Sequence, residues 1–282
     1  MPSRRVSYDL AESPLAPGEV AIVGAGPGDP GLLTLRALSL LEQADCLVFD
    51  RLVSKEVLAL ASPKARRFYV GKASRCHALT QDETNALLVR LAEEGKRVVR
   101  LKGGDPYIFG RGGEEAEVLI GHGIHFRVVP GITSAQGCAA YGGFPLTHRD
   151  YAQSVTFVTG HCKGDGDLAL DWTSLSVPHH TAVFYMGLAN AELISQQLQD
   201  HGLPADHPVA LVERGTTPEQ RQVITCLGEL VETIAREGLK PPTLIVVGEV
   251  VRLANILAQP APKEATFAEG ETLELVRERI AL

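Results

Sequence analysis

The sequence predicts an α/β protein with two domains, and three observations support this prediction. Short apolar runs of strand length alternate with amphipathic stretches of helix length along most of the 282 residues. The stretch 142–145, with two glycines and a proline, interrupts the alternation, and a second alternating series follows it. The chain is also long enough to give each series a core of its own. We therefore expect a flexible arm over residues 1–18, α/β domains over 19–132 and 133–258, and a tail over 259–282.

The first domain is expected to contain five strands separated by helices. Apolar runs predict the strands, at Val20–Val23, Cys46–Phe49, Phe68–Val70, Val98–Leu101 and Phe126–Val129. Apolar residues at helical spacing predict helices over Leu32–Gln43, Thr80–Glu94 and Gly113–Gly121. Thr80 and Glu83 have the spacing of a capping box at the start of the second of these helices.

The second domain is expected to repeat the alternation. Its strands are predicted at Ser154–Thr159, Ala182–Met186, Val209–Glu213, Val223–Cys226 and Leu244–Val247, and its helices at Ala191–Gln199 and Glu229–Glu237. A cleft between two such domains is the natural place for a ligand.

Composition and charge exclude several classes of function. The net charge of −7 argues against a general nucleic-acid binder. The apolar runs are too short to span a membrane, and no apolar signal segment follows the basic start of the chain, so we expect a cytoplasmic protein. The five cysteines include no Cys-x-x-Cys pair, and no cysteine or carboxylate cluster adjoins His122 and His125. We therefore expect free thiols and no metal site.

Two glycine-rich loops follow strands of the first domain, and each contains an acid. Residues 24–31 follow the strand that ends at Val23, and residues 103–106 follow the strand that ends at Leu101. Open α/β sheets bind ligands at such strand ends. The acids, Asp29 and Asp105, disfavour a pyrophosphate at these loops. They favour a ligand with an ammonium and a sulfonium, such as S-adenosylmethionine.

A dinucleotide site is the alternative for the first loop. The loop fits the pattern G-x-G-x-x-G, and Asp50 follows about twenty residues later, as in NAD(P)-dependent oxidoreductases. Pro27 and Pro30 weaken this interpretation, because they remove two backbone N–H donors that would otherwise face a phosphate. Asp29 is also suited to cap a helix that has Pro30 near its first position.

The segment 103–115 combines many glycines with charged side chains, which favours close approach of the backbone to a ligand. Arg111 and Glu114 either belong to that site or form a solvated helix pair at i, i+3 spacing. A third loop, 130–135, follows another strand and opens a helix with Thr133 as its natural N-cap.

Taken together, these motifs resemble the tetrapyrrole methylase family, and within it the uroporphyrinogen-III C-methyltransferases. The resemblance runs from about Glu19 to Leu253 and is carried by residues 24–37, 47–54, 101–115, 130–134 and 145–149. The motifs at 47–54 and 110–115 speak against other members of the family, such as the cobalt-precorrin methyltransferases, which remain alternatives. We expect the single-function form rather than a fused sirohaem synthase.

The resemblance implies two α/β domains of the tetrapyrrole methylase type, with the active site in the cleft between them, and a homodimer. S-adenosyl-L-methionine would be the methyl donor and S-adenosyl-L-homocysteine its product. The reaction would methylate C2 and C7 of uroporphyrinogen III and lead through precorrin-1 to precorrin-2. The sequence does not decide whether this precorrin-2 is used to make sirohaem, cobalamin or haem d1.

The resemblance also implies roles for individual residues. The donor would contact Pro27, Gly103, Gly104, Asp105, Thr133, Ser134, Met186, Gly215 and Thr243. The substrate would contact Arg51, Arg111, Arg149, His161 and Met186, and the catalytic candidates are Arg111, Asp50, Glu114 and His161. An arginine pKa above about 12 makes Arg111 an anchor and steering group rather than the base. Asp50, Glu114, His161 or an ordered water would then take the proton that leaves the macrocycle.

Overall fold

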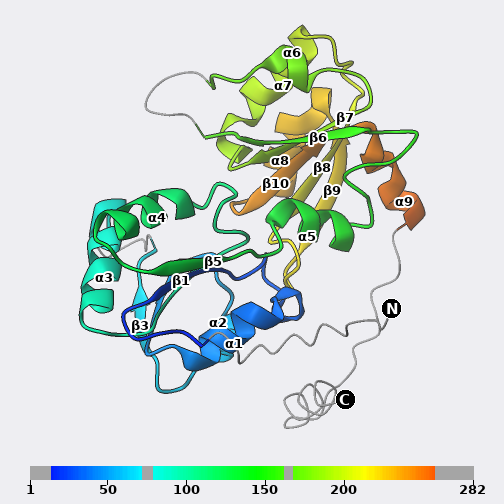
Figure 1. Ribbon diagram of the computed structural model, residues 1–282. Helices are drawn as coiled ribbons and strands as arrows, with labels where there is room; N and C mark the ends of the chain where they lie inside the picture. The colour runs from blue at the N-terminus through cyan, green and yellow to red at the C-terminus, as the bar shows by residue number, and fades with distance from the viewer. Residues whose placement is uncertain (1–13, 72–78, 162–167, 258–282) are drawn as a thin grey trace, which may run out of the picture.

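The computed structural model describes residues 14–71, 79–161 and 168–257, which form two lobes (Figure 1). Each lobe is built on a five-stranded sheet, so the predicted α/β class is confirmed. The first sheet contains β1 (Val20–Gly24), β2 (Cys46–Phe49), β3 (Arg66–Tyr69), β4 (Val98–Lys102) and β5 (Phe126–Val129). The second contains β6 (Ser154–Thr159), β7 (His180–Tyr185), β8 (Pro208–Glu213), β9 (Arg221–Cys226) and β10 (Thr243–Val247).

Helices separate most of these strands. They are α1 (Leu35–Gln43), α2 (Lys55–Ala59), α3 (Gln81–Glu93), α4 (Gly112–Gly121), α5 (Ser134–Tyr141), α6 (Trp172–Leu175), α7 (Ala191–Asp200), α8 (Leu230–Glu237) and α9 (Ala254–Leu257). The predicted capping box is confirmed at the start of α3, where Thr80 and Glu83 satisfy each other's backbone N–H groups.

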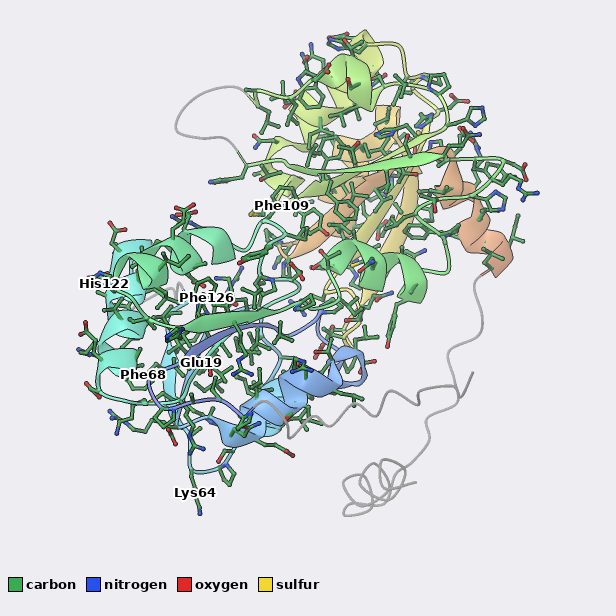
Figure 2. The ribbon with its side chains drawn as sticks, in the orientation of Figure 1. Glu19, Lys64, Phe68, Phe109, His122 and Phe126 are labelled. Carbon is green, nitrogen blue, oxygen red and sulfur yellow. The ribbon has the colours of Figure 1, made fainter. Side chains whose placement is uncertain are left out.

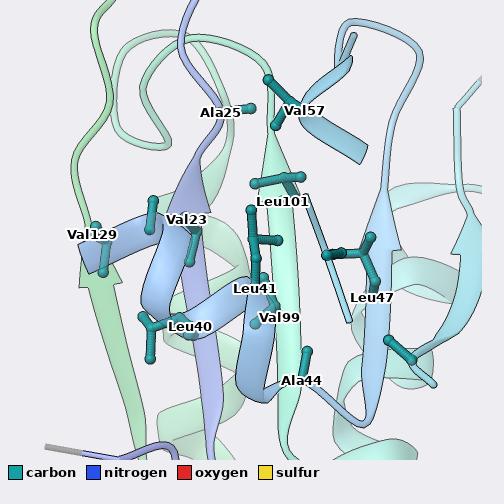
Figure 3. Close-up of a cluster of buried hydrophobic side chains, with 14 of the residues drawn as sticks. Val23, Ala25, Leu40, Leu41, Ala44, Leu47, Val57, Val99, Leu101 and Val129 are labelled. Atoms are coloured by element: carbon teal, nitrogen blue, oxygen red, sulfur yellow. The ribbon is translucent and has the colours of Figure 1, made fainter. Parts of the chain in front are cut away.

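The first sheet is parallel throughout, in the order β3-β2-β4-β1-β5. Helices cover both faces, which explains why β1 and β4 are buried along their whole length. On one face, Val23, Leu47 and Leu101 pack against Leu40 and Leu41 of α1 (Figure 3). The opposite face packs against α3 and α4.

The glycine-rich loops leave this sheet at its topological switch point. β1 and β4 are neighbours, but the chain proceeds from β1 to β2 on one side and from β4 to β5 on the other. A crevice at the carboxyl ends of two such strands is where open α/β sheets bind ligands. The strand order thus brings the two loops together at this position.

Backbone alone fills the space where β1, β4 and β5 end, and we call Gly24, Gly26, Gly104 and Gly131 the glycine junction. Gly26 and Gly104 exchange two backbone hydrogen bonds, with N···O distances of 3.1 and 2.7 Å. A Cβ on Gly24 would lie 2.5 Å from the Gly131 nitrogen and 2.7 Å from the Gly104 oxygen. No side chain fits between these backbones.

The second sheet is mixed, in the order β6-β7-β10-β8-β9. Only β6 and β7 are parallel, and the remaining neighbours are antiparallel. A loop over residues 214–220, rather than a helix, joins β8 to β9. Helix α5 follows β5 of the first sheet but packs against the second, with Cys138 and Ala139 beside Val183 and Val212.

Three local expectations need correction. Residues 14–18, assigned to a flexible arm, pack against the first lobe, because Leu15 is apolar and 2% exposed and its N–H donates to Gln43. The remainder of the arm and the tail over 259–282 lie outside the described residues. The helix predicted over Leu32–Gln43 is divided, since Asp29 caps a short 3-10 turn at Pro30–Leu32 and Thr34 caps α1. Helix α2 was not expected, although its N-cap Ser54 bonds the Val57 N–H.

Gly24→Ala should destabilise the protein by about 1–3 kcal/mol or more, because the methyl group must displace the backbone of the loops that follow β4 and β5. The measurement is the free energy of unfolding in urea. Gly121→Ala is the control, since its Cβ would meet nothing within 4 Å near the end of α4. This control should be neutral or stabilising by about 0.4–1 kcal/mol. Equal stabilities of the two variants would show that the junction tolerates a side chain.

Candidate active site

Several backbone donors of the first glycine-rich loop are already used within the protein. The N–H groups of Gly26, Asp29 and Gly31 donate to the Gly104 carbonyl, the Thr216 hydroxyl and the Asp29 carboxylate, respectively. Pro27 and Pro30 have no N–H to offer. A pyrophosphate-binding loop needs several free N–H groups aimed at the ligand. The geometry therefore argues against a dinucleotide site at this loop.

Both loop acids are also engaged by the protein itself. Asp105 accepts from the N–H groups of Tyr107 and Gly131, at 2.8 and 3.0 Å. Asp29 accepts from its own turn and from the Tyr141 hydroxyl, and this bond raises the pKa of Tyr141 to about 12. The carboxylates thus hold the loops in place, and the expected N-cap role of Asp29 is confirmed.

The first loop forms much of the contact between the lobes. Pro27 packs against α5, where a Cβ on Gly137 would lie 2.5 Å from its ring. Gly28 faces Thr216 and Thr217 of the second lobe. Gly215, in the same segment of the second lobe, packs on Cys138 of α5. A ligand at the carboxyl ends of β1 and β4 would therefore touch both lobes.

Thr133 and Ser134 lie against the second glycine-rich loop. A Cβ on Gly104 would lie 3.7 Å from the Ser134 hydroxyl, and Gly104 has a φ of +67°, which favours glycine. Thr133 occupies the predicted N-cap position of α5 but makes no side-chain cap. Its hydroxyl bonds the Tyr185 hydroxyl at 2.6 Å instead, and Tyr185 accepts from the Ala135 N–H at 3.0 Å.

A hollow of about 570 Å³ lies next to this region and brings together three of the predicted residues, Arg111, Glu114 and Met186. Its other lining residues are Pro106, Tyr107, Phe109, Gly112, Gly113 and Glu117. Phe109, Arg111 and Met186 have φ values of 51°, 59° and 56°. Left-handed backbone at residues other than glycine costs free energy and gathers at functional sites. Arg214 and Thr216 share this conformation at the neighbouring end of β8.

Arg111 and Glu114 form a two-point ion pair on the rim of this hollow. The guanidinium donates from Nε and Nη2 at 2.8 and 2.6 Å, and the two side chains are 55% and 52% exposed. The hydrogen bond to Glu114 raises the pKa of Arg111, so the guanidinium stays charged. The pair has the i, i+3 geometry of a solvated helix pair and also lines the hollow, so both interpretations fit its position.

Beneath this pair lies a buried charge cluster, which we define as Glu115, Arg100, Lys102 and Gln81. Glu115 is fully buried, and its Oε1 accepts from Arg100, Lys102 and Gln81 at 2.9, 2.8 and 3.3 Å. Burial lowers the pKa of the Lys102 ammonium despite the carboxylate beside it. Because these residues come from α4, β4 and α3, one carboxylate sets the position of the first turn of α4, which carries Arg111 and Glu114.

The Asp50–Leu52 segment is connected to the same region. Asp50 caps its own turn and lies 3.5 Å from Arg100 of the charge cluster. Gly103 packs on this segment, since its Cβ would lie 2.6 Å from the Leu52 Cβ. Arg51 is exposed.

Some of the remaining predicted residues lie near the hollow, and others are not connected to it within the part of the chain that the structure describes. His161 is exposed directly after Gly160, which packs against Gly187 beside Met186. Thr243 is buried and opens β10, the strand in which Ile245 pairs with Phe184 of β7, and Met186 directly follows β7. Arg149 is exposed on the turn between His148 and Ala152, and the contacts of the described residues do not join it to the hollow.

Sequence reasoning did not single out Arg100, Lys102 and Tyr185. Arg100 and Lys102 occupy alternate positions of an otherwise apolar central strand, and this pattern signals a buried charge that needs a partner. Tyr185 ends a buried strand, but nothing local indicates that its hydroxyl meets Thr133, 52 residues earlier in the chain.

Cys46, Cys138 and Cys226 are free thiols, and Cys76 and Cys162 lie outside the described residues. Within those residues, no group of three or more His, Cys, Asp or Glu side chains is arranged to hold a metal ion. No helix in the described part of the chain is long and apolar enough to cross a membrane.

Comparison with known sequences identifies relatives of this chain. Residues 19–231 match the family described as tetrapyrrole (corrin/porphyrin) methylases. The chain is similar to the sirohaem synthase of Azotobacter vinelandii, with 59% identity over 246 residues, or 87% of this chain and 53% of that protein. It is 56% identical over 253 residues to the sirohaem synthase of Methylobacillus flagellatus, covering 90% of this chain and 54% of that protein. The chain thus spans about half the length of these curated relatives.

Solved structures with the same fold include two kinds of methyltransferase. One is a uroporphyrin-III C-methyltransferase from Thermus thermophilus complexed with S-adenosyl homocysteine, with a TM-score of 0.72 and 42% identity. That match covers 83% of this chain and 99% of the Thermus chain. The other is a cobalt-precorrin-4 methyltransferase, with a TM-score of 0.74 and 26% identity over 87% of this chain and 99% of that one.

Glu115→Gln should destabilise the protein by about 3–5 kcal/mol, because it leaves Lys102 buried without its carboxylate partner and Arg100 with only the Asp50 carboxylate, 3.5 Å away. The matched control is Glu114→Gln on the same helix, which removes an exposed ion pair and should cost at most about 0.5 kcal/mol. The measurement is the free energy of unfolding in urea at neutral pH. Similar losses for the two variants would contradict the role given to Glu115.

Proposed function

The chain belongs to the tetrapyrrole methylase family, and on this premise we propose that it is an S-adenosylmethionine-dependent uroporphyrinogen-III C-methyltransferase. It would methylate C2 and C7 and form precorrin-2 through precorrin-1. The observation that carries the proposal is the placement of the Arg111–Glu114 pair and Met186 around one hollow, next to the glycine junction. The likeness to the Thermus enzyme, over 99% of that chain, supports the same reaction.

The residues around the junction suit the methyl donor. Ser134 offers a hydroxyl beside Gly104, and Thr133 does not cap the first turn of α5, where the Tyr185 hydroxyl accepts from the Ala135 N–H. Helix N-termini favour anionic groups such as the carboxylate of an amino acid. Met186, which is 53% exposed, offers an adaptable apolar contact. Bound S-adenosylmethionine would supply an electrophilic methyl group on a sulfonium, held by the nine residues assigned to the donor above.

The substrate carries carboxylate side chains on every pyrrole ring and an electron-rich carbon as nucleophile. A guanidinium can hold such a carboxylate in a planar two-point contact, as Arg111 already holds Glu114. In this proposal the Arg111 guanidinium binds a substrate carboxylate, either in place of Glu114 or together with it. This contact orients the reacting pyrrole. Positioning two reactants and excluding water is the main task in such a displacement.

A proton must leave the methylated macrocycle. Arg111 is unsuited to accept it, because the neighbouring Glu114 raises the pKa of an already strong base. Asp50, Glu114 and His161 remain the candidates. Asp50 has a buried cation, Arg100, on one side, which orients its carboxylate. The role of base, the site residues as a set and the domain boundaries stay predictions.

The assembly and location of the protein are further proposals. The family resemblance implies a homodimer, and light scattering on a sizing column would measure the mass of the particle. A cytoplasmic location is the expectation from the sequence. The partner proposed for this protein is its small-molecule substrate.

The direct test is to incubate the protein with uroporphyrinogen III and S-adenosylmethionine without oxygen, and to follow product masses. We expect an increase of one and then two methyl groups, with formation of S-adenosylhomocysteine. Calorimetry should show binding of S-adenosylhomocysteine and no competition by NAD. Methylation of a cobalt-precorrin alone would place the protein in another branch of the family. Tight NAD binding without binding of adenosyl compounds would favour the alternative of an NAD(P)-dependent oxidoreductase.

Arg111→Ala should reduce the methylation rate far more than the stability. Losing a charge-assisted bond at a desolvated site costs on the order of 2–5 kcal/mol, or roughly thirty- to several-thousand-fold in rate. Arg111→Lys should recover only part of the loss, because it keeps the charge without the planar fork. Arg252→Ala is the matched control, since Arg252 forms an i, i+3 pair with Glu249 of the same kind. A methylation rate of Arg111→Ala within about twofold of the control would show that Arg111 only forms an exposed helix pair with Glu114.

A further inference from the structure

Two exposed aromatic side chains, Tyr107 and Phe109, lie in the hollow beside Arg111 and have no role in the residue assignments above. Tyr107 is 56% exposed and Phe109 is 39% exposed, and Met186 adds a third exposed apolar group to the same lining. Single apolar residues on a surface need no explanation, but a cluster in a hollow marks a binding site. In Figure 2, Phe109 lies between the two lobes.

Both aromatic residues are held in place. The ring of Phe109 packs on the ring of Tyr185 with centroids 5.0 Å apart, and Tyr185 is fixed by Thr133. Phe109 also has a φ of 51°, which a bulky residue adopts only where its surroundings enforce it. The N–H of Tyr107 donates to Asp105. The protein thus presents the Phe109 ring in a defined conformation, and Tyr107 beside it on a backbone that Asp105 holds.

We propose that Tyr107 and Phe109 form an aromatic wall that contacts the pyrrole faces of the tetrapyrrole substrate while Arg111 contacts its carboxylate rim. This inference rests on the proposed function. The chemistry of the hollow matches both parts of such a molecule, since pyrrole rings are flat and apolar and their substituents are anionic. Rings held in advance bind with little loss of conformational entropy.

The guanidinium of Arg111 favours the macrocycle over the adenine of the methyl donor as the occupant of this wall, although Glu114 and Glu117 also line the hollow. The cation on its rim, Arg111, attracts carboxylates, and adenine carries none. The donor-binding candidates Gly104, Thr133 and Ser134 instead gather at the start of α5. A contact between adenine and the wall is therefore the competing outcome of the test.

The test uses Tyr107→Ala, Phe109→Ala and the double variant, with Ile120→Ala as control. Ile120 is 66% exposed near the far end of α4 and does not line the hollow. Uroporphyrin III, the oxidised macrocycle that cannot accept a methyl group, serves as the binding probe by fluorescence titration. S-adenosylhomocysteine affinity is measured separately by calorimetry, and the methylation assay gives KM and kcat.

Each single variant should weaken uroporphyrin binding about three- to tenfold and raise the KM for uroporphyrinogen III by a similar factor. Phe109→Leu, which keeps an apolar side chain, should recover part of the affinity. S-adenosylhomocysteine binding should match that of the control. The proposed contact with the macrocycle is contradicted if the double variant binds porphyrin as tightly as the control. It is also contradicted if the variants lose S-adenosylhomocysteine binding selectively.

The result separates this inference from the proposed function. If the wild-type protein methylates uroporphyrinogen III but the double variant binds porphyrin like the control, only the wall is overturned. If the wild-type protein binds porphyrin through these rings and transfers no methyl group, the proposed function fails and the wall is supported.

Discussion

The close approach of three strand ends, made by backbone atoms alone, is the constraint on which the rest of this structure depends. Gly24 lies so near Gly131 and Gly104 that a Cβ would overlap backbone of both. Two hydrogen bonds between Gly26 and Gly104 then join the loops that follow β1 and β4. These contacts join backbone to backbone, and the Asp105 carboxylate adds a hydrogen bond from the Gly131 N–H. Both loops, and the second lobe that packs on them, take their positions from it.

A second constraint lies below the hollow, where Glu115 gathers Arg100, Lys102 and Gln81. Burying ions is costly, and an apolar cluster would serve stability as well or better. The charged groups instead fix an orientation, because their hydrogen bonds hold the first turn of α4 in a set position relative to β4. Glu114 is the next residue along α4 and is half exposed. Two adjacent carboxylates on one helix therefore have opposite tasks, one holding the helix and one facing the hollow.

The hollow itself is built where backbone conformations are unfavourable. Phe109, Arg111 and Met186 line it and are all left-handed, although none is glycine. Such conformations persist only where neighbouring contacts enforce them, here the ring of Tyr185 and the cluster beneath α4. Tyr185 ends a strand of the second lobe, while Phe109 and Arg111 belong to the first. The arrangement of the hollow is consequently a property of the contact between the lobes.

The sequence by itself determined the elements whose signals are local. Periodicity indicated the ten strands to within two residues at either end, and the Thr80 capping box and the Asp29 N-cap were read correctly from spacing. The sequence also indicated that the glycine-rich loops follow strand ends, whereas the strand order that makes β1 and β4 neighbours came from the structure. Only the tertiary structure decided the partners of these elements. Thr133 has the N-cap position that its type predicts, yet its hydroxyl bonds Tyr185, 52 residues away. The physical reason is that period and capping depend on neighbours along the chain, whereas hydrogen-bond partners and left-handed conformations depend on residues brought together by folding.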